Sequence, residues 1–413
     1  MEKSIASLYF TIALEIYRYL FIYHVKDRRD TKMKISDVKI YSVKPRWIFI
    51  KITTDNGIEG WGEMISGTKT ETVVAGAKEM AKRIMGRNPL EIEGLWQELY
   101  RVFFRSGPIN MTIISGIEMA LWDIKGKYYN APIYELLGGA ARNKIKVYSW
   151  IGGDRPSDVV DGAQDRVDRG FDAVKMNATE EMHYIDSLKK IDEVVERVAA
   201  LREKFGTGLN IGIDFHGRVH KPMAKVLAKA LEPYRPMFLE EVVLCDNAEA
   251  FKEVSEHVTT PLATGERVYT RWGFKQLLSS GYIDIIQPDV ALTGGILETR
   301  KIIAMAEAYD IAAAPHAPYG PIALAATLQV DACSPNVFIQ EQSLGIHYNK
   351  GFDLLDFVEN KEIFQYKDGF VDLPSKPGLG LIIDEDKVKA VSAEGLEWSN
   401  PNWKNYDGTK AEW

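Results

Sequence analysis

Cysteine, histidine and uninterrupted apolar runs are all scarce in this chain of 413 residues. Its two cysteines, Cys245 and Cys333, are too few for a disulfide framework or a thiolate metal site, so we expect a reducing, cytoplasmic setting. A net charge of −7, with no basic cluster beyond Lys26–Arg29, argues against a nucleic-acid partner. The content of 46 % hydrophobic and 26 % charged residues excludes a largely disordered chain, and the length suits two or three domains.

The extension formed by residues 1–32 has an unusual composition. Its stretch Ile5–Tyr23 is apolar and aromatic, but Glu15 and Arg18 interrupt it. A helix that spans a bilayer needs about 20 apolar residues, and a secretory signal needs a cleavage site of small residues that this segment lacks. Three interpretations stay open: an accessory helix, a start codon assigned too far upstream with Met33 as the true start, and a membrane anchor. We expect no stable membrane insertion.

The next region, residues 33–145, has the order of an α+β unit, with strands first and helices after them. Its strand patterns surround the tight-turn sequence Asp55-Asn56-Gly57. Helical patterns follow at Glu71–Met85, Pro89–Phe104 and Met111–Tyr129.

From Val147 onward, short β-rich runs alternate with amphipathic helical stretches. The runs are Val147–Trp150, Ala173–Asn177, Asn210–Phe215, Phe238–Val243, Leu262–Glu266, Ile283–Asp289, Ile311–His316 and Val337–Glu341. Eight alternating units predict a closed parallel barrel of the (β/α)8 type. We therefore predict an α/β protein whose barrel occupies residues 146–345, with a C-terminal segment, residues 346–413, that packs back on the α+β capping domain.

Ionisable residues recur at the ends of six consecutive runs. They are Asp214, Glu240, Glu266, Asp289, His316 and Glu341. The intervals of 23 to 27 residues match one βα unit, so each residue is expected at the C-terminal end of its strand. Barrel enzymes place their active sites at that end, and these side chains should share one mouth.

The first three of these residues suit a hard metal ion. Three neighbouring carboxylates, Asp214, Glu240 and Glu266, cannot all stay ionised without a cation. Oxygen ligands favour Mg²⁺, whereas zinc would prefer histidine or cysteine. The competing interpretation is that these are unrelated surface carboxylates at strand ends. The equal spacing of the three residues argues against it.

Two of the seven histidines fall at the same mouth. His216 lies two residues after Asp214 and should share its side of the strand, and His316 follows an apolar strand. Asp289 precedes that strand and could orient the His316 ring. A buried, hydrogen-bonded histidine is the competing interpretation. A Mg²⁺ ion facing an imidazole base suggests proton abstraction next to a carboxylate.

Together these residues resemble the mandelate-racemase-like subgroup of the enolase superfamily, and most of all its sugar-acid dehydratases that act on D-galactonate. The motifs that carry the resemblance are Val174-Lys-Met-Asn, Gly212-Ile-Asp-Phe-His-Gly-Arg, Phe238-Leu-Glu-Glu, Thr264-Gly-Glu-Arg, Gln287-Pro-Asp, Ala314-Pro-His, Gln340-Glu-Gln-Ser, Pro377-Gly-Leu-Gly and Ala411-Glu-Trp. The resemblance extends from Met33 to Trp413 and leaves residues 1–32 without a counterpart.

The resemblance implies a role for each site residue. It makes Asp214, Glu240 and Glu266 ligands of Mg²⁺, and it makes His316, supported by Asp289, the base that removes the C2 proton. It makes His216 the acid that helps the 3-hydroxyl leave. It also implies a cap built from both chain ends and a homo-oligomer.

The remaining implied contacts concern the substrate. Glu341 would hydrogen-bond the substrate carboxylate, and Lys175 and Asn177 would also contact substrate. Racemases of the subgroup carry Lys-x-Lys at the second strand. Here the second position is Asn177, which is the dehydratase pattern and makes two-base racemisation unfavourable.

The expected reaction is removal of water from a six-carbon aldonic acid to give the 2-keto-3-deoxy acid. D-Galactonate leads, and D-gluconate or a broader range of aldonates are the alternatives. These acids differ at C4, which the cap loops around Pro45–Trp47 and Met64–Thr70 are expected to recognise. An acid-sugar racemase or epimerase and a non-catalytic sugar-acid-binding protein are the other interpretations.

Overall fold

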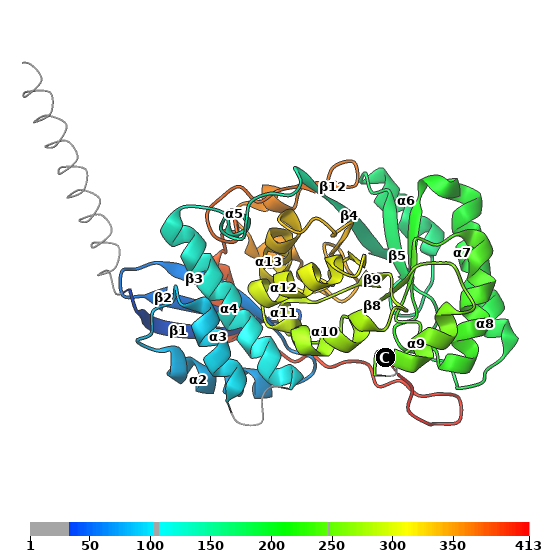
Figure 1. The fold of residues 1–413 in the computed structure, drawn as a ribbon, viewed down its shortest axis with the longest axis horizontal. Coiled ribbons are helices and arrows are strands. Elements are labelled where there is room, and N and C mark those ends of the chain that lie inside the picture. The colour runs from blue at the N-terminus through cyan, green and yellow to red at the C-terminus, as the bar shows by residue number, and fades with distance from the viewer. Residues whose placement is uncertain (1–32, 103–106, 247, 413) are drawn as a thin grey trace, which may run out of the picture.

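The computed structural model describes residues 33–102, 107–246 and 248–412, and the expectations for residues 1–32 lie outside these ranges. It consists of a capping domain and a barrel that pack side by side (Figure 1). Within the described ranges, no helix combines the length and apolar composition needed to cross a bilayer.

The capping domain begins with an antiparallel sheet of three strands in sequence order. Its strands are β1 (Ile35–Val43), β2 (Trp47–Thr54) and β3 (Glu59–Ile65). Gly57 connects β2 to β3 with a φ of +83°, a conformation that glycine adopts without strain, so the predicted tight turn is confirmed. The helices of the cap are α2 (Thr70–Ile84), α3 (Ile92–Arg101), α4 (Pro108–Tyr129) and α5 (Ile133–Leu136).

Helix α4 is the centre of the cap because it lies between the sheet and the barrel. It is buried on every side from Met111 to Ile124, which explains its apolar sequence without a polar face. Strand β3 approaches it very closely, since a Cβ atom at Gly62 would lie 1.8 Å from the carbonyl oxygen of Gly116. A larger residue at either glycine would separate the sheet from the helix.

The barrel is formed by parallel strands in the order of the chain, and the predicted fold class is confirmed. They are β4 (Lys144–Ile151), β5 (Ala173–Asn177), β6 (Asn210–Asp214), β7 (Phe238–Glu240), β8 (Leu262–Thr264), β9 (Ile285–Ile286), β10 (Ala312–Ala313) and β11 (Gln340–Gln342). β11 pairs with β4, and a parallel bridge between Ala313 and Val337 closes the ring. Tyr148, Phe238 and Ile339 belong to the apolar cluster that fills the interior.

Helices follow the first seven barrel strands. They are α6 (Val159–Asp168), α7 (Leu188–Phe205), α8 (Lys221–Leu231), α9 (Ala248–Ser255), α10 (Thr270–Ser279), α11 (Val290–Thr293), α12 (Ile296–Glu307) and α13 (Pro321–Ala332), with the 3-10 turns η1 (Gly206–Gly208) and η2 (Glu232–Tyr234). Several predicted strand runs were too long at their ends. Glu266 and His316 therefore lie in loops just beyond β8 and β10, and Asp289 caps the N-terminus of α11.

The chain after β11 leaves the barrel and returns to the cap. It contains η3 (Leu354–Phe357), η4 (Lys361–Phe364), β12 (Phe370–Asp372) and α14 (Glu385–Ala393). α14 packs on β1, and residues 396–412 then run along the side of both domains (Figure 1). The eighth strand thus leads into this segment instead of a barrel helix. The predicted domain limits of 33–145, 146–345 and 346–413 stay a prediction.

Two buried glutamates of the cap join it to the barrel. Glu63 on β3 accepts the backbone N–H groups of Gly320 and Ala323 at 2.6 and 2.9 Å, at the N-terminus of α13. Glu118 on α4 accepts those of Ile296 and Leu297 at 2.6 and 2.9 Å, at the N-terminus of α12. Both carboxylates satisfy amide groups that a helix leaves unpaired, and negative charge is favourable there.

The first prediction concerns this junction. Replacing Glu118 with alanine leaves two buried N–H groups without an acceptor, so we expect Glu118→Ala to lower the free energy of unfolding by about 1–3 kcal/mol. Urea unfolding followed by circular dichroism measures the change. The exposed Glu79→Ala on α2 is the control and should stay within about 0.5 kcal/mol of wild type. Equal stability of the two variants would contradict the role of Glu118.

Candidate active site

Three carboxylates meet at the C-terminal ends of neighbouring barrel strands. Asp214 ends β6, Glu240 ends β7, and Glu266 follows β8. One oxygen atom from each lies within 4.8 Å of the others. The structure therefore brings together the three residues that the sequence spacing selected, although each lies 26 residues from the next along the chain.

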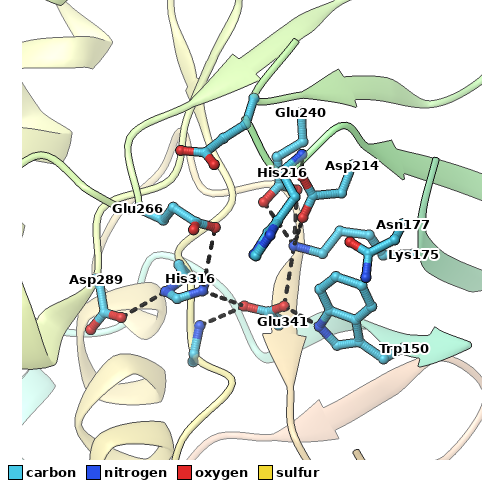
Figure 2. A network of polar contacts seen from close by, with 12 residues as sticks. Trp150, Lys175, Asn177, Asp214, His216, Glu240, Glu266, Asp289, His316 and Glu341 are labelled. Carbon is cyan, nitrogen blue, oxygen red and sulfur yellow. Dashed lines mark hydrogen bonds and ion pairs between the residues drawn. The ribbon is translucent and has the colours of Figure 1, made fainter. Parts of the chain in front are cut away.

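A buried lysine lies beneath the carboxylates. The Nζ atom of Lys175 is 2.8 Å from Oε1 and 2.9 Å from Oε2 of Glu240, and 3.2 Å from Oε1 of Glu341. It also lies 3.8 Å from Oδ2 of Asp214 (Figure 2). The side chain is fully buried, so its ammonium group is held in place by its neighbours and not by water.

One ammonium group does not neutralise this cluster. Burial raises the pKa of Asp214 to about 6, although Lys175 opposes the shift, and burial together with Asp214 raises the pKa of Glu240 well above its ordinary value. Glu266 is only partly buried, and although desolvation raises its pKa, His316 and Arg267 lower it to about 2. A further cation among these oxygens would stabilise the ionised carboxylates, which burial and mutual repulsion disfavour.

The residues present fit a hard metal ion at this position. All three candidate ligands are carboxylates, and hard cations such as Mg²⁺ and Ca²⁺ take oxygen ligands. Oδ2 of Asp214 is buried and has no hydrogen-bond donor in the described structure. A buried carboxylate oxygen without a donor is costly, and a bound cation would satisfy it.

His316 is held between acidic groups. Its Nδ1 atom lies 2.7 Å from Oδ2 of Asp289, and its Nε2 atom lies 3.4 Å from Oε2 of Glu266 and 4.0 Å from Oε2 of Glu341. Asp289 is itself fixed, because its Oδ1 atom accepts the N–H of Ala291 at 2.7 Å. Although burial lowers the pKa of His316, Glu266, Glu341 and Asp289 together raise it to about 10. The ring is thus oriented through Nδ1 and presents Nε2 to the mouth.

His216 occupies the same mouth in a different environment. It has a φ of +53°, which is uncommon for a residue with a side chain, and its backbone N–H donates to Oδ1 of Asp214 at 2.7 Å. Burial lowers the pKa of its imidazole to about 3, the reverse of the shift at His316. The predicted pair of histidines therefore shares one site. The surroundings of His316 favour the charged imidazolium, and those of His216 favour the neutral ring.

The remaining predicted residues line the same space (Figure 2). Asn177, at the end of β5, donates through Nδ2 to the carbonyl of Gly153 at 3.1 Å, while its buried Oδ1 has no partner in the described structure. Oε2 of Glu341 accepts the N–H of Ala317 at 2.7 Å, and Oε1 accepts Nε1 of Trp150 at 2.5 Å. The structure thus brings all nine predicted site residues to one end of the barrel.

Comparison with known proteins agrees with this geometry. The N-terminal domain model of mandelate racemase / muconate lactonizing enzyme matches residues 21–138, and the enolase C-terminal domain-like model matches residues 158–387. The chain belongs to the enolase superfamily.

Solved structures of superfamily members are similar over nearly the whole chain. A candidate dehydratase from Mesorhizobium loti is 31 % identical, with a TM-score of 0.80 and coverage of 87 % of this chain and 98 % of that one. A candidate mandelate racemase/muconate lactonizing enzyme from Burkholderia SAR-1 is 32 % identical, with a TM-score of 0.82 and coverage of 92 % and 100 %. A candidate galactarate dehydratase from Agrobacterium radiobacter, bound to Na and L-malate, is 28 % identical, with a TM-score of 0.84 and coverage of 92 % and 100 %.

Sequence reasoning missed several residues of this superfamily site. Trp150 ends a predicted strand, but nothing in the sequence indicates that its indole would reach Glu341, 191 residues away. Glu241 follows a candidate metal ligand, and Arg267 donates to it through Nε at 3.0 and 2.9 Å. The repeated Glu-Glu and Glu-Arg pairs at adjacent strand ends, Glu240-Glu241 and Glu266-Arg267, were the available signal for this ion pair.

The second prediction concerns cation binding without turnover. Mg²⁺ alone should raise the melting temperature of metal-free protein, because an ion that binds the folded state stabilises it. Asp214→Asn removes one ligand, and we expect its affinity for Mg²⁺ to fall by at least about 10- to 100-fold, the loss that changes around metal ligands already cause. Glu249→Gln, an exposed change on α9, is the control. A wild-type response to Mg²⁺ in Asp214→Asn would contradict the proposed metal site.

Proposed function

We propose that this chain is a Mg²⁺-dependent dehydratase of a six-carbon aldonic acid, with D-galactonate as the favoured substrate. The product is the 2-keto-3-deoxy acid, and C2–H and C3–O are the bonds that break. The observation that carries the proposal is the placement of two differently supported imidazoles beside one carboxylate trio. Asp289 orients the His316 ring through Nδ1, whereas the backbone of His216 is held by Asp214, so the two rings are fixed independently and can serve two different proton transfers.

In the proposed reaction, the neutral form of His316 removes the C2 proton through Nε2, and an ene-diolate forms at C1 and C2. Although burial lowers the pKa of this ring, Glu266 and Glu341 raise it, and Mg²⁺ bound by Glu266 would lower it again toward neutrality. Asp289 holds Nδ1 and keeps the ring in the orientation that exposes Nε2. Bound Mg²⁺ would stabilise the negative charge that develops on the substrate carboxylate. Lys175 and Glu341 lie next to each other at 3.2 Å, where they are proposed to contact the C1 carboxylate together with Asn177.

His216 is proposed to assist the second bond cleavage. When the ene-diolate collapses, the C3–O bond breaks and the leaving hydroxide takes a proton from the imidazole to become water. The enol that remains becomes the 2-keto acid when C3 takes up a proton. His216 is neutral in the absence of substrate, and an anionic substrate beside it raises its pKa toward the value that an acid requires.

Racemisation by two bases is a weaker candidate because of the residue at the end of β5. Asn177 occupies the position from which a second base would act, and its amide cannot take up a proton at neutral pH. Lys175, on the same strand, is bound by Glu240 and Glu341 and stays charged, since these carboxylates raise its pKa well above the ordinary value in spite of burial. A one-base dehydration therefore suits this strand better.

The third prediction identifies the substrate. A panel of aldonic acids incubated with the protein and Mg²⁺ should give a 2-keto-3-deoxy acid from D-galactonate, detected as a semicarbazone and by NMR. D-Gluconate tests recognition of C4, and galactarate tests whether a second carboxylate is accepted. Turnover of D-galactonate should stop with a chelator and return with Mg²⁺. Absence of a 2-keto product from every acid in the panel would contradict the proposed activity.

The fourth prediction separates the two histidines. His316→Asn should abolish both dehydration and exchange of the C2 proton with solvent deuterium, because no ene-diolate forms. His216→Asn should slow dehydration by about 10²–10⁴-fold, the usual contribution of an acid catalyst, while exchange at C2 persists. NMR of recovered substrate in D₂O measures the exchange, and the same samples give the rate of product formation.

The control is His257→Asn, which changes an exposed histidine that contacts the backbone of Glu253. It should dehydrate and exchange like wild type. Each variant is used only after circular dichroism confirms that it is folded. Exchange that survives in His316→Asn but disappears in His216→Asn would show that the assigned roles are reversed.

A further inference from the structure

The capping domain places one buried arginine at the rim of the barrel mouth. Arg46 lies in the connection between β1 and β2, and only 5 % of it is exposed. Its guanidinium donates to the carbonyl oxygen of Pro318 at 2.5 Å. Pro318 follows the His316-Ala317 dipeptide of the proposed base, so the cap contacts the loop that carries the catalytic imidazole.

Three aromatic rings fix the direction of this guanidinium. Its Cζ atom lies 4.7 Å from the ring centre of Tyr348, 5.2 Å from that of Tyr319 and 5.7 Å from that of Trp398. The rings come from three different segments of the chain, and cation–π contacts of this kind favour a desolvated cation. The position of Arg46 is therefore set before any ligand arrives.

The charge of Arg46 is attracted by Glu63 and Asp154 only from beyond ion-pair distance. In the described parts of the chain it forms no ion pair with a carboxylate, and its buried Nε has no hydrogen-bond partner. Two other cations at this mouth do contact a carboxylate, since Lys175 contacts Glu240 and Arg267 contacts Glu241. A buried guanidinium with unused donors is costly unless a ligand supplies oxygen atoms.

Tyr319 connects Arg46 to the proposed reaction centre. Its ring packs edge-on against the His316 ring, with ring centres 5.8 Å apart. The Cζ atom of Arg46 lies 5.2 Å from the centre of the same Tyr319 ring. If C1 is held at the carboxylate trio and C2 faces His316, the rest of an extended sugar acid is directed away from the barrel floor. The cap, with Arg46 at its rim, covers that direction.

Resting on the proposed function, we propose that Arg46 is the subsite for the distal end of the substrate and donates hydrogen bonds to the oxygen atoms on C5 and C6. It would then select acids of six carbons over shorter ones. The chemistry recognised is a hydroxyl or carboxylate oxygen at the chain end. Arg46 takes no part in proton transfer, so its contribution depends on the length of the substrate.

A purely structural role makes a different prediction. If Arg46 only holds the loop at Pro318, its loss displaces His316 and slows every substrate equally. If it binds the distal end, its loss slows the six-carbon acid and leaves a four-carbon acid, which has no C5 or C6, unchanged. Chain length therefore separates the two roles.

The fifth prediction uses this difference. We compare kcat/KM of wild type, Arg46→Gln, Arg46→Lys and the control Arg87→Gln on D-galactonate and on the four-carbon acid that matches it at C2 and C3. Arg87 is a partly exposed arginine of the cap whose partner is Glu98. C2 deuterium exchange is recorded alongside dehydration, so that a slow substrate still gives a rate.

We expect Arg46→Gln to lose roughly 10- to 100-fold on the six-carbon acid, the effect of one hydrogen bond to a charged group, and less than about twofold on the four-carbon acid. Arg46→Lys should show the same dependence on the chain length of the substrate, with a smaller loss of kcat/KM. This variant keeps the test valid if Arg46→Gln does not fold. A larger loss on galactarate than on D-galactonate would identify a carboxylate as the preferred distal group.

Equal losses on both chain lengths, or no loss on either, would overturn the proposal and leave the proposed function intact. If wild type dehydrates neither acid, the proposed function itself is wrong. The two failures are thus distinguished by the wild-type rates.

Discussion

Electrostatic repulsion at the barrel mouth is the constraint on which the site depends. Asp214, Glu240, Glu266 and Glu341 converge at one end of the barrel, where little water is available to screen their charges. Lys175 binds two of them directly, and His316 lies near two. Burial and the neighbouring carboxylates raise the pKa values of Asp214 and Glu240 in spite of these cations. A site that holds such a cluster in the folded state is suited to a metal ion and an anionic substrate.

The barrel tolerates this repulsion because its apolar interior holds the strands beneath it. Tyr148 and Phe238 pack edge-on with ring centres 6.2 Å apart below the charged layer, and the strand pairing extends around the whole ring. The backbone positions from which these side chains project are fixed by that pairing. Preorganised charges of this kind stabilise a developing negative charge without reorganisation during the reaction.

The sequence predicted the repeating part of this arrangement well. Parallel strands place their C-terminal ends at one edge, so the intervals between Asp214, Glu240 and Glu266 were enough to predict that they meet. The ends of the strands were predicted less well, because Asp289 and His316 continue an apolar run after the strand pairing has ended. A hydrophobic pattern indicates which residues are buried and not which residues pair as strands. These loop residues are as buried as the strands, so the pattern does not show where each strand ends.

Contacts between the cap and the barrel had no such signal. Arg46 and Pro318 are 272 residues apart, and Glu63 and Gly320 are 257 apart, in elements with no common period. Each contact joins a side chain to a backbone group, so the identity of the barrel residue carries no information about its partner. The sequence singled out two cap loops, Pro45–Trp47 and Met64–Thr70, but as places for substrate recognition and not as contacts with the barrel.

These cap contacts converge on the loop that carries the proposed base. The N–H of Ala317 is bound by Glu341 of the barrel, the carbonyl of Pro318 by Arg46, and the N–H of Gly320 by Glu63. His316 therefore takes its position from both domains. A catalytic group needs an orientation held to within a fraction of an ångström, and neither domain alone supplies all three contacts. The cap is consequently a part of the proposed reaction centre as well as its cover, because its contacts with the barrel help to place the His316 imidazole.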